Sequence, residues 1–155
     1  MINNMILLTI LINMFVNIPS AAQDFSLQEA AIAALSGMDA QSQRLKVIAQ
    51  NIANADNVAR TPDADPYRRK VIFFKKSNAF EVAVYDIKDD LLTPFNFKFD
   101  PNHIAANKYG EVTISNVNIV LENIDMAEAK RIFQANATSY GVTKQLKEKL
   151  LESMK

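Results

Sequence analysis

One long stretch of the chain, Leu27–Asn54, repeats apolar or small residues at alternating intervals of four and three. This spacing places them on one side of an α-helix, in the heptad pattern of helices that pack side by side. Because many of these residues are small, the helix would bury little area and be marginal in isolation. The pattern therefore predicts a helix that needs helical partners, with a seam of Ala31, Leu35, Met38, Ser42, Leu45, Ala49 and Ile52.

The middle of the chain changes character after Asn54, Asp56 and Asn57, which end the helix. Pro62 and Pro66 then provide turns, because proline fixes φ and keeps the preceding residue out of the helical region. Alternating apolar residues predict strands at 67–75, 80–87, 95–99 and 111–115. Six of the nine phenylalanines fall between residues 73 and 99, so we expect an aromatic core and a half-buried third strand.

The last forty or so residues return to a helical pattern that begins at Val117 or Leu121 and continues to Met154. We therefore expect an α+β fold, in which two long terminal helices pair as a coiled-coil-like hairpin with a small antiparallel β-module inserted between them, at one end. The expected parts are 1–22, 23–57, 58–116 and 117–155. The two helices carry more apolar surface than one hairpin can bury, which implies helices from other chains. The stripe on the second helix is Ile124, Ala127, Ile132, Ala135, Val142, Leu146 and Leu150.

The first 22 residues form a separate segment. The apolar run Met5–Ile18 is followed by Pro19-Ser-Ala-Ala22, which is typical of a secretory signal peptide with cleavage between Ala22 and Gln23. No Lys or Arg precedes the apolar run, so an uncleaved membrane anchor and a mis-assigned start codon stay open as alternatives. Contact with a membrane is expected only through residues 1–22, if they are not removed.

Composition excludes several classes of function. With 17 basic and 17 acidic residues the net charge is zero, which argues against a nucleic-acid partner. The chain has no Cys and one His, and its three glycines are too scattered to cradle a phosphate. We therefore expect no cofactor, no metal, no small-molecule substrate and no enzymatic activity. His103 is expected in a turn, and Asp86, Asp89 and Asp90 in a solvated loop without the spacing of a calcium site.

Four ordered motifs carry a family resemblance that covers residues 24–155. The segment Ala34–Ala55, with its Asn51-Ile-Ala-Asn54 element, resembles the first helix of flagellar rod and hook proteins. Three further motifs resemble the proximal-rod members of the flagellar basal-body rod protein family: Pro66–Lys70; Asp100–His103 with Gly110–Asn118; and Ile124–Met126 with Phe133–Asn136.

The resemblance implies a structural subunit of the periplasmic rod in the flagellar basal body. Its terminal helices would pack with those of neighbours in a helical array, and its β-module would form the outer layer and lateral contacts. Other rod subunits and the rod-base protein would be the partners, and the assembly would transmit torque. The residues implied in subunit contacts are Leu35, Met38, Leu45, Ile48, Asn51, Ile52, Asn54, Pro66, Tyr67, Arg68, Arg69, Phe133, Asn136, Leu146 and Leu150.

The sequence departs from the family pattern at two places. Ala64 and Asp65 stand where the family usually has a Gly-rich turn, and the segment 1–22 precedes an otherwise complete subunit. Family members are normally exported unfolded by the type III apparatus, so a cleaved signal would imply another route. A periplasmic or membrane-anchored adaptor or binding protein that reuses this fold is the alternative function, with an apolar pocket as its expected feature.

Two motifs allow two interpretations each. Asn51, Asn54 and Asn57 are expected either to form hydrogen bonds between subunits or to terminate the helix locally. The basic run Arg68–Lys70 is expected either to bind an acidic partner or to form a solvated strand edge.

Gly37 costs about 1 kcal/mol relative to Ala inside a helix, so either a close contact requires it or the helix tolerates it.

Overall fold

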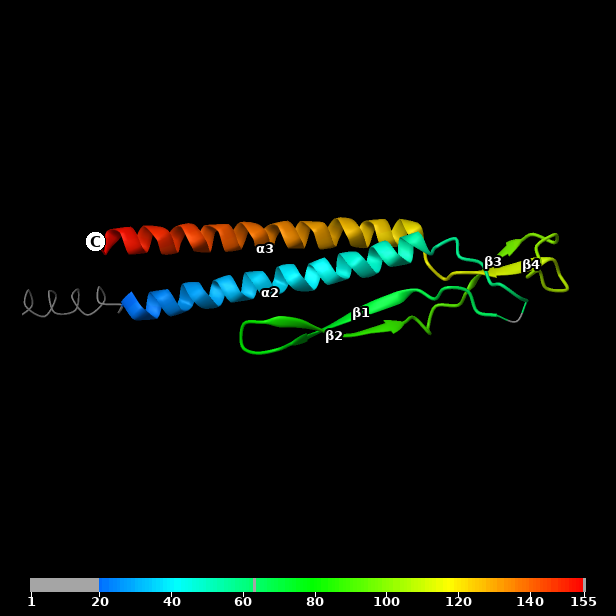
Figure 1. Cartoon of the computed structure of the whole chain (residues 1–155), viewed down its shortest axis with the longest axis horizontal. Helices are drawn as coiled ribbons and strands as arrows, with labels where there is room; N and C mark the ends of the chain where they lie inside the picture. The colour runs from blue at the N-terminus through cyan, green and yellow to red at the C-terminus, as the bar shows by residue number, and fades with distance from the viewer. Residues whose placement is uncertain (1–19, 63, 155) are drawn as a thin grey trace, which may run out of the picture.

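Two long antiparallel helices form the body of the molecule. A computed structural model describes residues 20–62 and 64–154, with α2 at Ser20–Ala53 and α3 at Ile119–Ser153 lying side by side (Figure 1). The expected α+β fold with paired terminal helices is confirmed. Most of the segment expected to be a signal peptide lies outside the described residues, although α2 already includes Ala22 and Gln23. Neither described helix has a stretch that is both long and apolar enough to cross a bilayer.

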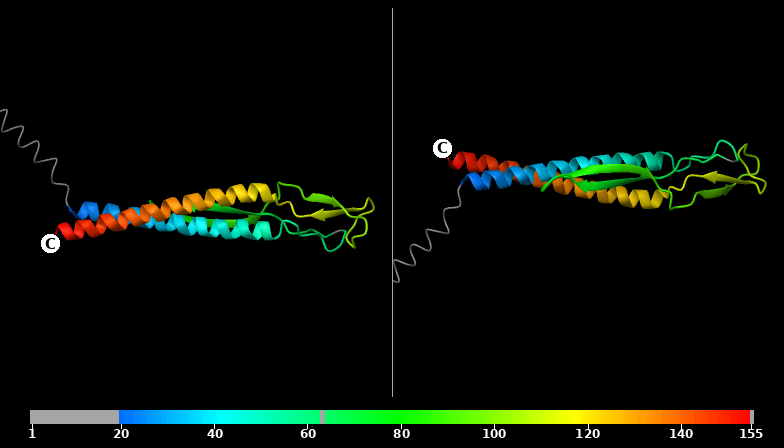
Figure 2. Two further views of the ribbon diagram at one scale, coloured as in Figure 1. Left: turned by 90° about the horizontal axis from the view of Figure 1, so that it is seen from above. Right: turned by 90° about the horizontal axis from the view of Figure 1, so that it is seen from below.

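The β-structure consists of two separate antiparallel ribbons. Strands β1 (Lys70–Lys76) and β2 (Val82–Asp89) form a hairpin that packs on α2, with a bulge between Phe73 and Phe74. Strands β3 (Asn96–Phe99) and β4 (Glu111–Ile114) form a ribbon that extends past the end of the helices (Figure 2). The expectation of one β-module at one end therefore holds for β3 and β4 only, because the longer hairpin runs back along α2.

The expected first strand began at Tyr67, but β1 begins at Lys70. The backbone N–H groups of Tyr67 and Arg69 donate to the side-chain oxygens of Asn57 and Asn116, at 3.1 and 2.7 Å. A backbone group bonded to a side chain is not available for a strand ladder. Three residues of apparent strand are therefore a fixed, extended connection.

The expected aromatic core is wrong. Phe97 and Phe99 in β3 are 63% and 73% exposed, and Phe73, Phe74 and Phe80 are also exposed. A two-stranded ribbon buries a face only where another element covers it, and β3 and β4 are not packed on either helix. The aromatic alternation correctly indicated strands, although it did not indicate burial.

The residues of α2 that are buried inside the chain differ from the heptad row, which was expected to pack on partner helices. Residues of α2 that are buried include Ala34, Ala40, Val47 and Ile48, whereas Leu35 is 47% exposed. Gly37 lies against Asn136, and Asn51 lies against Glu122, so the two helices keep one antiparallel register between these contacts. Within the chain α2 buries two other faces, one against α3 and one against the hairpin, and the packing of the heptad row on helices of other chains stays a prediction.

Candidate functional site

A buried polar cluster joins the helix pair to the β-ribbons, and we call it the junction. At its centre, the side chain of Asn51 is only 1% exposed. Its Nδ2 donates to the carbonyl oxygen of Lys70 at 2.9 Å and to Glu122 Oε2 at 3.1 Å. Its Oδ1 accepts from the Tyr67 hydroxyl and from the Lys70 N–H, both at 2.9 Å. One amide side chain thus connects α2, α3 and the start of β1.

A buried ion pair lies next to this amide. Glu122 is 1% exposed and accepts from Arg69 Nε at 2.6 Å. The Arg69 guanidinium also lies 3.7 Å from Asp90 and 3.5 Å from Asp125, while Arg44 of α2 lies 3.1 Å from Asp125. A buried carboxylate is tolerated only with such a paired, hydrogen-bonded cation. The charge of Arg69 is therefore compensated within the chain, so a solvated strand edge is wrong for this residue.

Asp90 also belongs to the junction, and the expectation of a solvated loop is wrong for this residue. Its carboxylate accepts from the Thr93 hydroxyl at 2.8 Å, and its side chain is 12% exposed. The Thr93 hydroxyl is the main cause that lowers the pKa of Asp90, with backbone N–H donors and Arg69 acting in the same direction. Asn116 donates from Nδ2 to the backbone carbonyl oxygens of Asp90 and Thr93, which ties the β2–β3 loop to the start of α3.

Two more motif residues hold the connection that enters the junction. The Arg68 guanidinium lies 3.9 Å from the centre of the Phe95 ring and donates to the Asp90 carbonyl oxygen at 3.1 Å. Burial is the main cause that raises the pKa of Tyr67, with Asp89 and Glu122 adding to it. Pro66 is buried as well. The Pro-Tyr-Arg-Arg motif therefore connects the helix to the hairpin through buried contacts.

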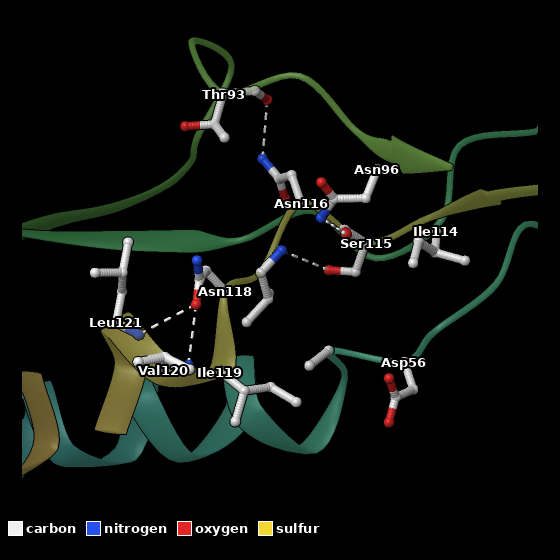
Figure 3. A pocket seen from close by; sticks show the side chains of 12 residues that line it. Asp56, Thr93, Asn96, Ile114, Ser115, Asn116, Asn118, Ile119, Val120 and Leu121 are labelled. Atoms are coloured by element: carbon white, nitrogen blue, oxygen red, sulfur yellow. Dashed lines mark hydrogen bonds between the residues drawn. The ribbon is translucent and has the colours of Figure 1, made fainter. Parts of the chain in front are cut away.

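A groove of about 430 Å³ lies beside the junction, between the end of α2 and the start of α3 (Figure 3). Asn118 caps α3 there, since its Oδ1 accepts from the N–H groups of Val120 and Leu121 at 3.0 and 3.3 Å. Among the described residues that line this groove, Asp56 is the only one with a titratable side chain. A single carboxylate among amides and aliphatic groups is not an acid–base or nucleophilic constellation.

Both helices leave an apolar face uncovered in the single chain. On α3, Ile124 is 60% exposed, and Val142 and Leu146 are 49% exposed. These positions share one side of the helix, which is turned away from the seam with α2. On this side of α3 the exposed Glu128 and Arg131 lie between Ile124 and Val142. On α2, Leu35 is exposed, and Met38, Leu45 and Ile52 are half-buried. Exposed aliphatic side chains that share one face of a helix indicate a surface that another molecule covers.

The predicted contact residues therefore fall into three groups. Asn51, Pro66, Tyr67, Arg68 and Arg69 lie together at the junction, while Asn54 lies nearby and donates to the Gln50 carbonyl oxygen at 2.7 Å. Ile48 is buried on α2, Asn136 lies against Gly37, and Phe133 is half-buried on α3. The remaining predicted residues, on the outer faces or towards the helix ends, are Leu35, Met38, Leu45, Ile52, Leu146 and Leu150.

Sequence reasoning missed Glu122, Asn116 and Thr93 and placed Asp90 in a solvated loop, whereas all four residues complete the junction. Glu122 had a detectable signal, because it lies seven residues before Ala129 and fourteen before Asn136 on the buried side of α3. A carboxylate at a seam position needs a cationic partner. Arg69 was a candidate for that partner.

Comparison with known proteins places this architecture in a family. Residues 32–60 match the model of the flagella basal body rod protein family, and residues 110–153 match that of the C-terminal region of flagellar basal body rod FlgEFG proteins. FlgC of Agrobacterium fabrum is 36% identical over 124 residues, which cover 77% of this chain and 89% of that protein.

Relatives from two other bacteria give the same result. FlgC of Borreliella burgdorferi is 35% identical over 135 residues, which cover 73% of this chain and 88% of that protein. FlgC of Buchnera aphidicola is 41% identical over 107 residues, which cover 65% of this chain and 78% of that protein. The resemblance drawn from the four motifs is therefore confirmed. The chain belongs to the FlgC family of flagellar basal-body rod proteins.

Proposed function

We propose that this rod subunit polymerises through its two terminal helices, with other rod subunits and the rod-base protein as neighbours, in a helical array that transmits torque across the periplasm. As a rod protein it is a structural component and not an enzyme. The observation that carries the proposal is the row of exposed aliphatic side chains on α3, Ile124, Val142 and Leu146. Contacts between unlike surfaces of identical subunits produce open arrays of this kind.

The junction supports the proposal mechanically. A subunit that passes torque needs its helices and its β-ribbons to move as one body. The bonds of Asn51 and Glu122 connect α2, α3 and β1 through buried, charge-assisted contacts, which are stronger than neutral hydrogen bonds. We infer that the junction keeps the ribbons at a fixed orientation to the helices.

Removal of residues 1–22 belongs to the same proposal. Cleavage after Ala22 would take only Ser20–Ala22 from the start of α2. Mass spectrometry of the protein from purified basal bodies would find Gln23 at the mature N-terminus. An intact Met1 on a membrane-bound chain without rod proteins would instead favour the adaptor hypothesis.

A substitution on the outer face of α3 tests the assembly role. Val142→Asp places a charge on the exposed aliphatic row, whereas Gln134→Asp places the same side chain on a polar, exposed part of the helix. In a strain that lacks its own copy of the gene, we expect Val142→Asp to abolish swimming and to be absent from purified basal bodies.

The control variant Gln134→Asp should swim normally. Both purified chains should have the same helical circular dichroism, since neither position is in the seam between α2 and α3. Normal swimming and normal incorporation of Val142→Asp would refute the assembly role of this face.

A further inference from the structure

The connection between β2 and β3 exposes two neighbouring leucines almost completely. Leu92 is 96% exposed and Leu91 is 77% exposed, and no other large apolar side chain among the described residues is as exposed as Leu92. Single exposed apolar side chains are ordinary on protein surfaces, whereas an adjacent pair forms a small apolar projection that another molecule can cover. We call this pair the leucine turn.

The leucine turn is fixed at both of its ends. The Asp90 carboxylate accepts from the N–H groups of Leu92 and Thr93 at 3.0 and 3.1 Å, and from the Thr93 hydroxyl at 2.8 Å. Asn116 Nδ2 donates to the carbonyl oxygens of Asp90 and Thr93 at 3.2 and 3.1 Å. A turn that is already ordered loses little further backbone freedom when it binds, which favours association. The junction therefore presents the two leucines in a fixed position.

The groove beside the junction can receive apolar side chains. Its volume of about 430 Å³ is in the size range of pockets that bind small ligands. It is lined by Ile114 and Val117, and also by Ile119, Val120 and Leu121, which are 40%, 68% and 57% exposed (Figure 3). Apolar side chains that displace water from such a groove lower the free energy of the complex.

The leucine turn and the groove lie at the same level along the molecule. Thr93 directly follows the leucine turn, and it also lines the groove. The connection between β2 and β3 lies on the side of the hairpin, whereas the groove lies at the adjacent ends of α2 and α3 (Figure 1). The exposure of Leu91 and Leu92 shows that the groove of their own chain does not receive them. Two copies that stand side by side in the same orientation can bring the leucine turn of one to the groove of the other.

We propose that Leu91 and Leu92 of one copy insert into the groove of a second copy that stands beside it. This contact rests on the proposed rod assembly and adds to it a lateral interface that is separate from the helix faces. The occupant is a second copy because the turn and the groove lie at one level of the same chain and are both apolar. Since they are different surfaces, each added copy leaves one turn and one groove free, and the array stays open.

Engineered disulfides test the contact directly, because the chain has no cysteine of its own. Leu92→Cys and Val120→Cys are carried on two differently tagged full-length copies in a strain that lacks the native gene. A disulfide forms only where the two Cα atoms approach to about 4.4–6.8 Å. We expect an oxidised dimer that carries both tags in purified basal bodies. Replacing Val120→Cys by the control Lys130→Cys, which is exposed about 15 Å further along α3, should abolish the dimer.

A double substitution tests whether the leucines are needed. Leu91→Ser with Leu92→Ser should leave the melting temperature of the isolated chain unchanged, since both side chains are exposed. It should lower the amount of the subunit in basal bodies by at least about tenfold, because the burial of one leucine is worth at least that factor in binding. The matched control, Leu91→Met with Leu92→Met, keeps the apolar bulk and should assemble normally.

Three outcomes would overturn this inference while the rod assembly stands. Basal bodies could contain both cysteine copies without the doubly tagged dimer, or Leu92→Cys could link to a different rod protein. Normal incorporation of Leu91→Ser with Leu92→Ser would also contradict it. If tagged copies without cysteine were absent from basal bodies, the proposed assembly itself would fail, and this inference with it.

Discussion

The two ends of the helix pair are stabilised in different ways. At the junction end, α2 is covered by α3 and by the hairpin, and side chains such as Asn51, Glu122 and Val47 are buried. At the other end, the last turns of α3 are exposed, as shown by Leu146 at 49% and Leu151 at 52%. The difference indicates that the buried contacts at the junction stabilise the fold of the single chain. The apolar side chains at the far end depend on neighbouring subunits for their burial.

The largest expected effect is at the buried ion pair. Arg69→Met leaves the carboxylate of Glu122 without its cation, and should lower the free energy of unfolding by about 3–5 kcal/mol. At the far end, Lys144→Met breaks a 4.0 Å pair with Glu148 on the helix surface and should change it by less than about 0.5 kcal/mol. Urea unfolding of the purified chains, followed by circular dichroism, compares the two variants.

The same experiment contains its own check. Adding Glu122→Gln to Arg69→Met removes the unpaired charge and should recover part of the loss. A similar cost for Arg69→Met and Lys144→Met would show that the junction is not the more stable region.

Hydrogen exchange sharpens the comparison without a mutation. Backbone N–H groups of α2 near Ile48 should be the best protected, and those of α3 beyond Leu146 should exchange at least about tenfold faster, which corresponds to about 1.4 kcal/mol. The measurement is made on the isolated chain and on assembled rods. Equal protection at both ends of the isolated chain would contradict the proposed dependence on neighbours.

A smaller difference in stability is expected between alanine substitutions at the two helical glycines. An added Cβ at Gly141 meets no described atom within 4 Å, so Gly141→Ala should stabilise the isolated chain by about 1 kcal/mol. At Gly37 an added Cβ would lie 2.7 Å from Asn136 Nδ2 and 3.0 Å from its Cγ. Gly37→Ala should therefore lose this gain, because the Asn136 side chain must move. Thermal unfolding of both variants tests the prediction, and equal stabilisation would exclude a close-packing role for Gly37.

The smallest expected effect depends on pH. The pKa of Asp90 is lowered in the folded chain, chiefly by the Thr93 hydroxyl. Its ionised form therefore adds stability above the ordinary pKa of 3.8, and that stability is lost as pH falls through the lower folded value. Thr93→Ala should move acid unfolding to a slightly higher pH, whereas Thr138→Ala, with its hydroxyl bonded to the Gln134 carbonyl oxygen, should not. An unchanged acid transition would contradict this role for Thr93.

The sequence predicted the helices and strands better than it predicted the contacts between them. The asparagines after Ile52 placed the end of α2 to within a residue, because they favour turns, and the alternation around Phe97 located β3. Periodicity identifies a face of a helix, but it cannot say whether that face meets a helix of the same chain, a hairpin or another copy. For this reason the row from Leu35 to Ile52 could be recognised as a packing face, and its contact with helices of other chains stays a prediction.

Long-range polar contacts were the least predictable part. Asn51 and Arg69 were noticed as motif residues, but their bonds to Glu122 span 71 and 53 residues. Local propensity contains no information on such distances. Only the presence of a carboxylate at a seam position gave a hint that an ion pair would form there.

The β1–β2 hairpin has a consequence for the subunit before it assembles. Both of its long edges are unpaired within the described structure, and an unpaired edge is a template for uncontrolled association with other strands. Exposed lysines lie along it at Lys75, Lys76 and Lys88, and the bulge at Phe73 and Phe74 twists it. These features discourage aggregation through strands, whereas the exposed aliphatic faces of the helices can still associate with other molecules. Unassembled subunits should therefore remain soluble at low concentration and associate through their helices as the subunit concentration rises.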